Sequence, residues 1–177
     1  MGFSLRRRGA RMPEAVKQSL GLAPGERVLS FAEELAGGQP TGTTVVATTY
    51  GLYAVDAAGT RVVGRPWHEV DAGSWSSELQ QLTVTWVDRA KPAQWVLGDS
   101  SLLPETLRER VQASVVLAQK LEVGPRRSAR AVIRQDLATG DLVEQVVLGR
   151  NARADDAELA LAADEALDYL REQVGLS

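Results

Sequence analysis

The region from Arg27 to Leu97 constrains the fold most, because short β-forming runs alternate there with glycine, proline and aspartate. In the clearest run, apolar Leu82, Val84 and Trp86 alternate with threonines. This alternation is typical of an antiparallel strand with one buried and one polar face. Seven such runs predict an antiparallel barrel or sandwich. They are Val28–Glu33, Thr43–Thr49, Leu52–Val55, Arg61–Val63, Trp67–Val70, Leu82–Val87 and Ala93–Leu97.

The spacing of the apolar residues changes after residue 100 and becomes typical of a helix. Apolar residues recur there at steps of four and three, at Leu103, Leu107, Val111, Val115 and Ala118. That spacing places them on one face of a helix, and Pro104 suits its first turn. We expect this amphipathic helix to close the open end of the strand layer.

Further elements are expected on both sides of this region. Residues 1–12 form a basic tail that we expect to be disordered, and Pro13–Leu20 reads as a short helix ending at Gly21. Residues 13–122 are assigned to the main domain, and 123–128 to a connector. Residues 129–177 then form a hairpin and a helix that pack on the barrel. Their elements are strands Ala129–Gln135 and Leu142–Leu148, a helix cap at Asp155 or Asp156, and an apolar stripe of Leu159, Ala163, Ala166, Leu170 and Val174.

Parts of residues 24–121 resemble the bacterial members of the pleckstrin-homology-like (PH-like) and GRAM-like families. The similar segments are Pro24–Leu29, Val46–Tyr53 and Trp67–Val70, which resemble the opening strand, the second hairpin and the segment before the fifth strand of those families. The resemblance implies a mainly β fold, α+β overall, with a seven-stranded antiparallel barrel capped by a C-terminal helix. The extra hairpin and helix lie outside it. It also implies a binding or assembly module, although a fold alone does not dictate function.

Composition excludes several kinds of chemistry. The chain has no cysteine, and His68 is its only histidine, so thiolate and multi-histidine metal sites are excluded within one chain. The spacing Gly37…Gly42-Thr43 lacks the lysine of a phosphate-binding loop. We therefore expect a protein without catalytic activity, cofactor or metal. No apolar run reaches the roughly 20 residues of a membrane span, which favours a soluble, cytoplasmic protein. The excess of arginine over lysine favours a bacterial source.

A few residues are candidates for contact with a ligand or partner. Trp86 and Trp95 alternate into the core, whereas Trp75 lies in a glycine- and serine-rich segment and is the best candidate for a surface contact, with His68 as a second. The loop 36–42 has no basic residue and follows two glutamates, which argues against phosphoinositide binding there. The N-terminus instead carries four arginines without an acid, at Arg6, Arg7, Arg8 and Arg11.

The leading functional hypothesis is a non-catalytic module that binds a protein partner or self-associates. One alternative is peripheral binding to an anionic membrane or nucleic acid through the four N-terminal arginines, on a chain whose net charge is −3. A second alternative is a small-molecule-binding protein or a hydrolase with its site near Trp75 and His68.

Overall fold

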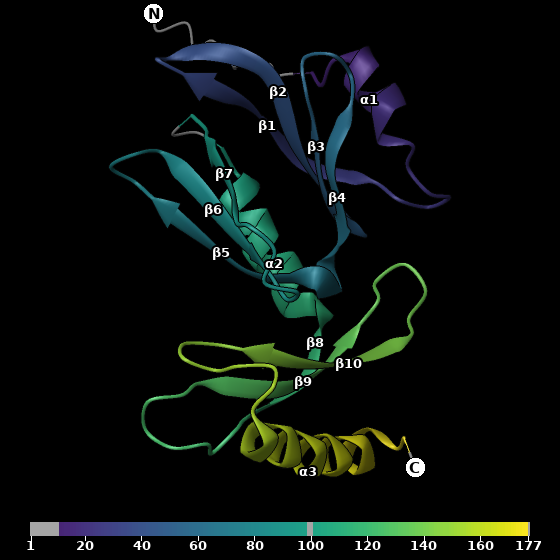
Figure 1. The fold of residues 1–177 in the computed structure, drawn as a ribbon. Coiled ribbons are helices and arrows are strands. Elements are labelled where there is room, and N and C mark those ends of the chain that lie inside the picture. The colour runs from purple at the N-terminus through teal and green to yellow at the C-terminus, as the bar shows by residue number, and fades with distance from the viewer. Residues whose placement is uncertain (1–10, 99–100, 177) are drawn as a thin grey trace, which may run out of the picture.

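The fold was analysed in a computed structural model, which describes residues 11–98 and 101–176. It is mainly β, with three antiparallel sheets arranged in layers from the N-terminal to the C-terminal end (Figure 1). In chain order, the described elements are α1 (Glu14–Leu20), β1 (Val28–Ala36), β2 (Gln39–Thr48), β3 (Gly51–Val55), β4 (Arg61–Pro66), the 3₁₀ helix η1 (Trp67–Glu69), β5 (Val70–Ser76), β6 (Gln81–Trp86), β7 (Ala93–Val96), α2 (Leu103–Ser114), β8 (Val115–Lys120), β9 (Ala129–Gln135), β10 (Leu142–Leu148) and α3 (Ala157–Val174).

The first seven strands form two sheets, not the closed barrel that the sequence predicts. Among the described residues, the hydrogen-bonded order is β1-β2-β3-β4 in one sheet and β5-β6-β7 in the other, with no pairing between them. The break falls after Pro66, which has no backbone N–H to donate and is followed directly by η1. The two sheets share one hydrophobic core instead of closing edge to edge.

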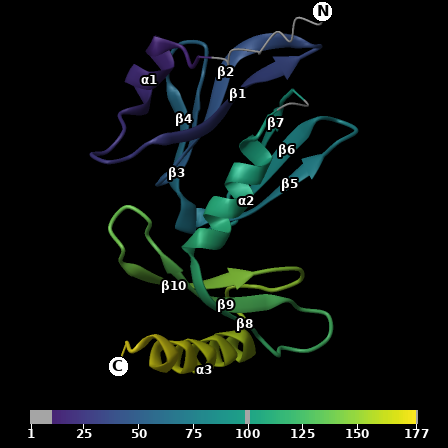
Figure 2. The ribbon, with the colours of Figure 1, turned by 180° about the vertical axis from the view of Figure 1, so that it is seen from behind.

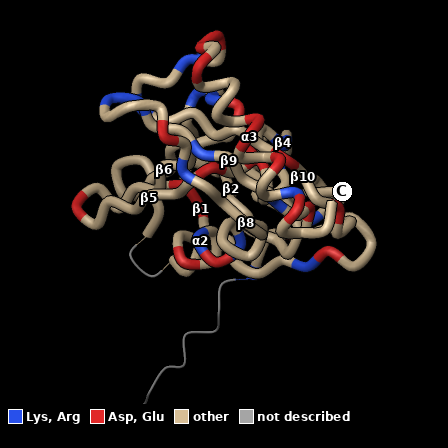
Figure 3. The backbone as a smooth tube through the Cα atoms, turned by 90° about the horizontal axis from the view of Figure 1, so that it is seen from below, with Lys and Arg blue, Asp and Glu red and all other residues tan. Residues whose placement is uncertain are grey.

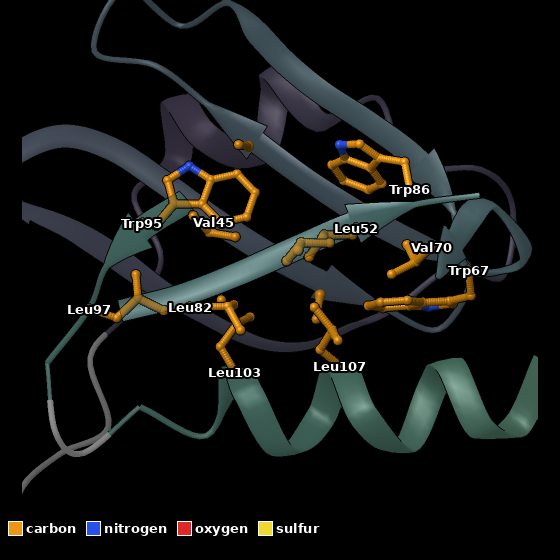
Figure 4. Close-up of a cluster of buried hydrophobic side chains, with 13 residues drawn as sticks. Val45, Leu52, Trp67, Val70, Leu82, Trp86, Trp95, Leu97, Leu103 and Leu107 are labelled. Carbon is orange, nitrogen blue, oxygen red and sulfur yellow. The ribbon is translucent and has the colours of Figure 1, made fainter. Parts of the chain in front are cut away.

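The core of these two sheets follows the alternation in the sequence. Leu82, Val84 and Trp86 are buried on β6, and Trp95 is buried on β7. Leu103 and Leu107 project from α2 into the same cluster (Figure 4), so α2 covers the space between the sheets (Figure 2). The expected role of this helix in closing the strand layer is therefore confirmed for its first three turns.

The second half of strand β2, from Thr44 to Thr48, is buried on both faces, which explains its β-branched sequence. Val45 faces the shared core, whereas Val46 packs against α1 on the other side of the sheet. Helix α1 begins after Pro13 and ends at Gly21, whose φ of 56° is left-handed, as the sequence predicts.

Two predictions in this region, one of a strand and one of a loop, are corrected. Trp67–Val70 is not a strand, because residues 67–69 form η1, and the fifth strand runs from Val70 to Ser76. The segment 36–42 is mostly strand, not loop. Gly37 and Gly38, with φ of 57° and 78°, make a two-residue turn that lets β1 and β2 pair up to Ala36 and Gln39.

The helix predicted to extend through Ala118 ends at Ser114. Val115 and Ala118 belong instead to β8, which pairs with β9. Val115 and Val116 are β-branched, and such residues favour a strand. Pairing with β9 gives their backbone N–H and C=O groups the hydrogen bonds that a helix would provide internally. The helical spacing of the apolar residues was therefore misleading over its last turn.

The C-terminal elements agree with the predicted hairpin and helix, but their apolar faces do not pack on the first seven strands as predicted, because the hairpin forms a third sheet with β8. Strands β9 and β10 have the predicted bounds, and α3 packs on them over a separate hydrophobic cluster. Asp156, one of the two predicted caps, accepts hydrogen bonds from the amides of Glu158 and Leu159. Gly175 ends the helix with a φ of 74°.

Polar side chains of β9 and β10 hold this layer against η1. The Arg134 Nη2 donates to the carbonyls of Trp67 and Val70, at 2.6 and 3.0 Å. The Gln145 Nε2 donates to the carbonyl of His68 at 2.7 Å. The short helix that replaces the predicted strand is thus one of the points at which the C-terminal layer is attached.

Candidate functional site

Trp75 lies at the edge of a surface groove between β5 and the first turns of α2. It is half-buried and packs partly against the shared core. The groove has a volume of about 360 Å³. Its lining residues are Gly73, Ser74, Trp75 and Leu82 from the sheet and Pro104, Glu105 and Arg108 from the helix. Trp75 is thus partly a core residue and partly a surface residue, as its sequence context left open.

The close approach of α2 to β5 depends on Gly73. A Cβ atom built on Gly73 would overlap the Cδ2 atom of Leu107, a residue that is only 1% exposed. The absence of a side chain lets the helix pack directly against the strand at this point. Pro104, within the first turn of α2, then forms part of the groove wall.

Strand β5 is an open edge of its sheet. It pairs with β6 on one side, and no described strand pairs with it on the other. Ala72, Gly73 and Ser74 are exposed along it. An open edge offers unpaired backbone donors and acceptors to another extended chain.

The rim of the groove carries two charges of opposite sign. Glu105 and Arg108 are both exposed on α2, and neither takes part in an ion pair among residues 11–98 and 101–176. They can therefore bind polar or charged groups of a ligand without breaking an existing contact.

The two predicted contact residues lie at different ends of β5. His68 is part of η1, before the strand, and does not line the groove that contains Trp75. Its Nδ1 atom is buried without a hydrogen-bond partner, and its carbonyl accepts from Gln145. Ser74 in the groove therefore has no neighbouring histidine base, so the lining offers no serine–histidine pair for nucleophilic catalysis.

A second hollow, of about 240 Å³, lies beside β3 and β4 and holds a hydrogen-bonded network. The Tyr53 hydroxyl donates to the Glu26 Oε1 at 2.9 Å, and the Thr48 hydroxyl donates to the same oxygen. Burial, reinforced by the hydrogen bond and negative charge of Glu26, raises the pKa of Tyr53 to about 12. Because Glu26 is already engaged, this network favours a structural role.

The arginines from 126 to 134 do not form one basic surface. Arg134 is 1% exposed, Arg130 pairs with Asp71, and Arg127 pairs with Asp156. Basic and acidic positions are interspersed along the backbone (Figure 3). The burial of Arg134 could not be predicted from the sequence, because an arginine on a strand is as compatible with an exposed position as with a buried one.

The predicted N-terminal contact lies largely outside the described residues. Arg6, Arg7 and Arg8 fall within residues 1–10, and only Arg11 is described, as an exposed residue. Binding through these four arginines stays a prediction.

Residues 11–98 and 101–176 carry neither a cluster of metal ligands nor a membrane-spanning helix. No group of three or more histidine, aspartate or glutamate side chains is placed there to hold a metal ion. None of the described helices combines the length and apolar character needed to cross a bilayer.

Comparison with known proteins assigns no family. Neither a protein-family model nor a curated protein matches the chain.

Proposed function

We propose that this protein is a non-catalytic interaction module that binds an extended segment of a protein partner along β5. The observation that carries the proposal is the open edge of β5 beside the groove of Trp75. An extended peptide can add to such an edge as a further strand, with main-chain hydrogen bonds giving affinity. Alternate side chains of the peptide then reach the groove, where specificity arises.

The groove has the features expected of a peptide anchor site. Trp75 and Pro104, which are both partly exposed, offer apolar surface for one side chain, and aromatic residues contribute strongly at interfaces. Glu105 and Arg108 lie at the rim, where charges select a partner more than they add affinity. We therefore expect a peptide with one large apolar residue flanked by polar or charged ones.

We further propose that the PH-like resemblance of residues 24–121 reflects a PH-like unit that ends with α2, because β8 belongs to the third sheet. Seven antiparallel strands in two sheets, followed directly by a helix against their shared core, support this assignment. It agrees with a role in binding, because the groove lies where that helix meets the edge of the second sheet.

A display library of short random peptides tests the binding function directly. Selected peptides are expected to shift the NMR amide signals of β5 and the first turns of α2. Replacing Trp75 with alanine is expected to weaken binding by roughly tenfold or more, as for an interface hot spot. Replacing Arg108 with alanine is expected to weaken binding less, and by an amount that falls as salt is added, because Arg108 is a rim charge. Glu109→Ala is the matched control, because Glu109 is exposed on the same helix and does not line the groove.

Two results would contradict the proposal. Selected peptides could perturb only residues remote from β5, or the Arg108→Ala and Glu109→Ala proteins could bind them equally well. Circular dichroism of the Trp75→Ala protein separates loss of binding from loss of folding, because Trp75 also contacts the core.

Self-assembly is a second candidate function, favoured by the open edge of β8. This strand pairs with β9 on one side, and no described strand pairs with its other edge. Val115 and Val116 are 38% and 39% exposed there, and Tyr169 of α3, which is 54% exposed, lines an adjoining groove of about 510 Å³. We propose a second copy of the chain as its occupant. Antiparallel pairing of two β8 strands places the two Lys120 charges at opposite ends, which avoids like-charge repulsion.

A further inference from the structure

A further concave surface lies in the C-terminal layer, between the β8–β9 and β10–α3 loops. It has a volume of about 820 Å³, and four basic residues and one acidic residue line it. The basic residues are Lys120, Arg126, Arg127 and Arg150, and the acidic one is Glu122. We name it the basic groove. None of its lining residues lines the groove of Trp75, so its function does not depend on the proposed peptide site.

The two loops that form the basic groove are joined by hydrogen bonds. The amide of Ser128 donates to the carbonyl of Arg150 at 2.9 Å, and the amide of Arg150 donates to the Ser128 hydroxyl at 2.7 Å. The Asn151 Nδ2 donates to the carbonyl of Arg126 at 2.9 Å. Asn151 has a φ of 57°, a left-handed conformation that asparagine tolerates better than most residues. These contacts hold Arg126 and Arg150 on neighbouring, connected loops.

Arg127 has a different role from the other basic residues. It forms ion pairs with Asp156 and Glu158, and these hydrogen bonds raise its pKa. Asp156 is also the cap of α3, so Arg127 fixes the β8–β9 loop to the helix. Lys120, Arg126 and Arg150 take part in none of the ion pairs among the described residues. Their charges face only Glu122 among the lining residues.

This arrangement selects a compact anion over a nucleic acid. Guanidinium groups bind phosphate oxygens through paired hydrogen bonds, and a lysine adds a point charge. Among the residues that the structure describes, no aromatic side chain lines the basic groove, so these residues offer no surface on which bases can stack. The net charge of −3 for the chain further disfavours a long polyanion. We propose that Lys120, Arg126 and Arg150 bind the phosphate group of a small phosphorylated molecule or a lipid headgroup.

The test measures binding of pyrophosphate by calorimetry and of vesicles containing phosphatidic acid by sedimentation. The full chain is expected to bind at least one of these probes, and the affinity is expected to fall with added salt. Binding of pyrophosphate alone indicates a free ligand, whereas retention on the vesicles without pyrophosphate binding indicates a lipid headgroup. NMR amide shifts are expected to localise to residues 121–128 and 149–151.

Charge-removing variants complete the test. The triple variant Lys120→Gln, Arg126→Gln, Arg150→Gln is expected to lower affinity at least tenfold, because each replaced charge-assisted hydrogen bond is lost. All three residues are exposed, so the fold is expected to be retained. Arg153→Gln is the matched control, since Arg153 is 77% exposed on the same loop, pairs with Asp155 and does not line the groove. Equal binding by the triple variant and the control, no binding of either probe, or tighter binding of a single-stranded oligonucleotide or a phosphopeptide overturns the proposal.

Discussion

Among the described residues, Arg134 is a buried cation that forms no ion pair with a carboxylate. It is bound instead by the carbonyls of Trp67 and Val70 and by the Ser114 hydroxyl, which accepts from its Nε at 2.9 Å. Burial lowers the pKa of Arg134 to about 10, and the negative charge of Asp71 opposes this shift. The group is still protonated at neutral pH, so its donors stay available to all three acceptors.

We predict that Arg134→Ala destabilises the protein by about 2–4 kcal/mol, measured by chemical denaturation. The replacement leaves the buried Val70 carbonyl without its side-chain donor, at a cost of about 1–3 kcal/mol. It also removes the donor to the Ser114 hydroxyl and one of the two donors to the Trp67 carbonyl, which still accepts from the Val70 amide, while removal of a buried charge offsets part of the loss. Arg130→Ala is the comparison, because its ion pair with Asp71 is partly exposed and is expected to contribute less than about 1 kcal/mol. A smaller effect of Arg134→Ala than of Arg130→Ala would show that the buried contacts of Arg134 do not stabilise the attachment of the C-terminal layer to η1.

At the scale of elements, the packing of α2 on β5 determines the shape of the candidate peptide groove. The helix contacts the strand where Gly73 leaves room for Leu107. One turn earlier on the helix, Leu103 is also fully buried in the shared core. A side chain at position 73 therefore cannot be accommodated without moving the helix or rearranging Leu107.

Gly73→Ala is expected to destabilise the protein by about 1–3 kcal/mol, as overpacking of a close-packed core usually does. It is also expected to change the NMR amide shifts of α2 and to weaken any peptide bound beside Trp75. Gly98→Ala provides the control, because a Cβ atom there would meet no atom of the described residues within 4 Å. Equal thermal stability of the Gly73→Ala and Gly98→Ala proteins would mean that the close packing of α2 on β5 does not require a glycine at position 73.

Among the described residues, the buried hydrophobic side chains form three clusters, and the two largest are joined to each other largely by polar contacts. One lies between the first two sheets and α2, and the other lies between the third sheet and α3. Arg134, Gln145 and the Arg130–Asp71 pair connect them, and Leu137 of the β9–β10 turn adds an apolar contact. This arrangement leaves β8 connected to α2 at its start yet open along its outer edge.

Analytical ultracentrifugation tests self-assembly through β8. The unmodified chain is expected to sediment with the mass of two chains, and Val116→Lys is expected to shift it to the monomer, because a charge on an edge strand opposes pairing. Leu161→Lys is the control, since Leu161 is exposed on α3 and does not line the groove beside β8. A monomer at all concentrations, or equal dimerisation of both variants, contradicts the proposed dimer. Binding of a different protein at β8 by the monomeric chain would also contradict it.

The candidate site was predictable only in part. Trp75 stood out because few apolar residues surround it in the sequence, and the structure places it in a groove. Its companions Glu105 and Arg108 come from a helix about 30 residues later, so no local pattern links them. Lys120 and Arg150 of the basic groove are equally distant in sequence, and only the pairing of their two loops brings them onto one surface.

The sequence by itself determined the elements whose signals are local. The alternation in Leu82–Trp86, a cap at Asp155 or Asp156 and the stop at Gly175 depend on neighbouring residues. The structure confirms the alternation and the stop, and it places the cap at Asp156. Tertiary structure alone decided that Val115 begins a strand, that Trp67 begins a short helix and that Arg134 is buried. Each of these outcomes depends on hydrogen bonds between segments that are not adjacent in the chain, such as the bonds that pair β8 with β9. The energy of such bonds cannot be predicted from the pattern of neighbouring residues.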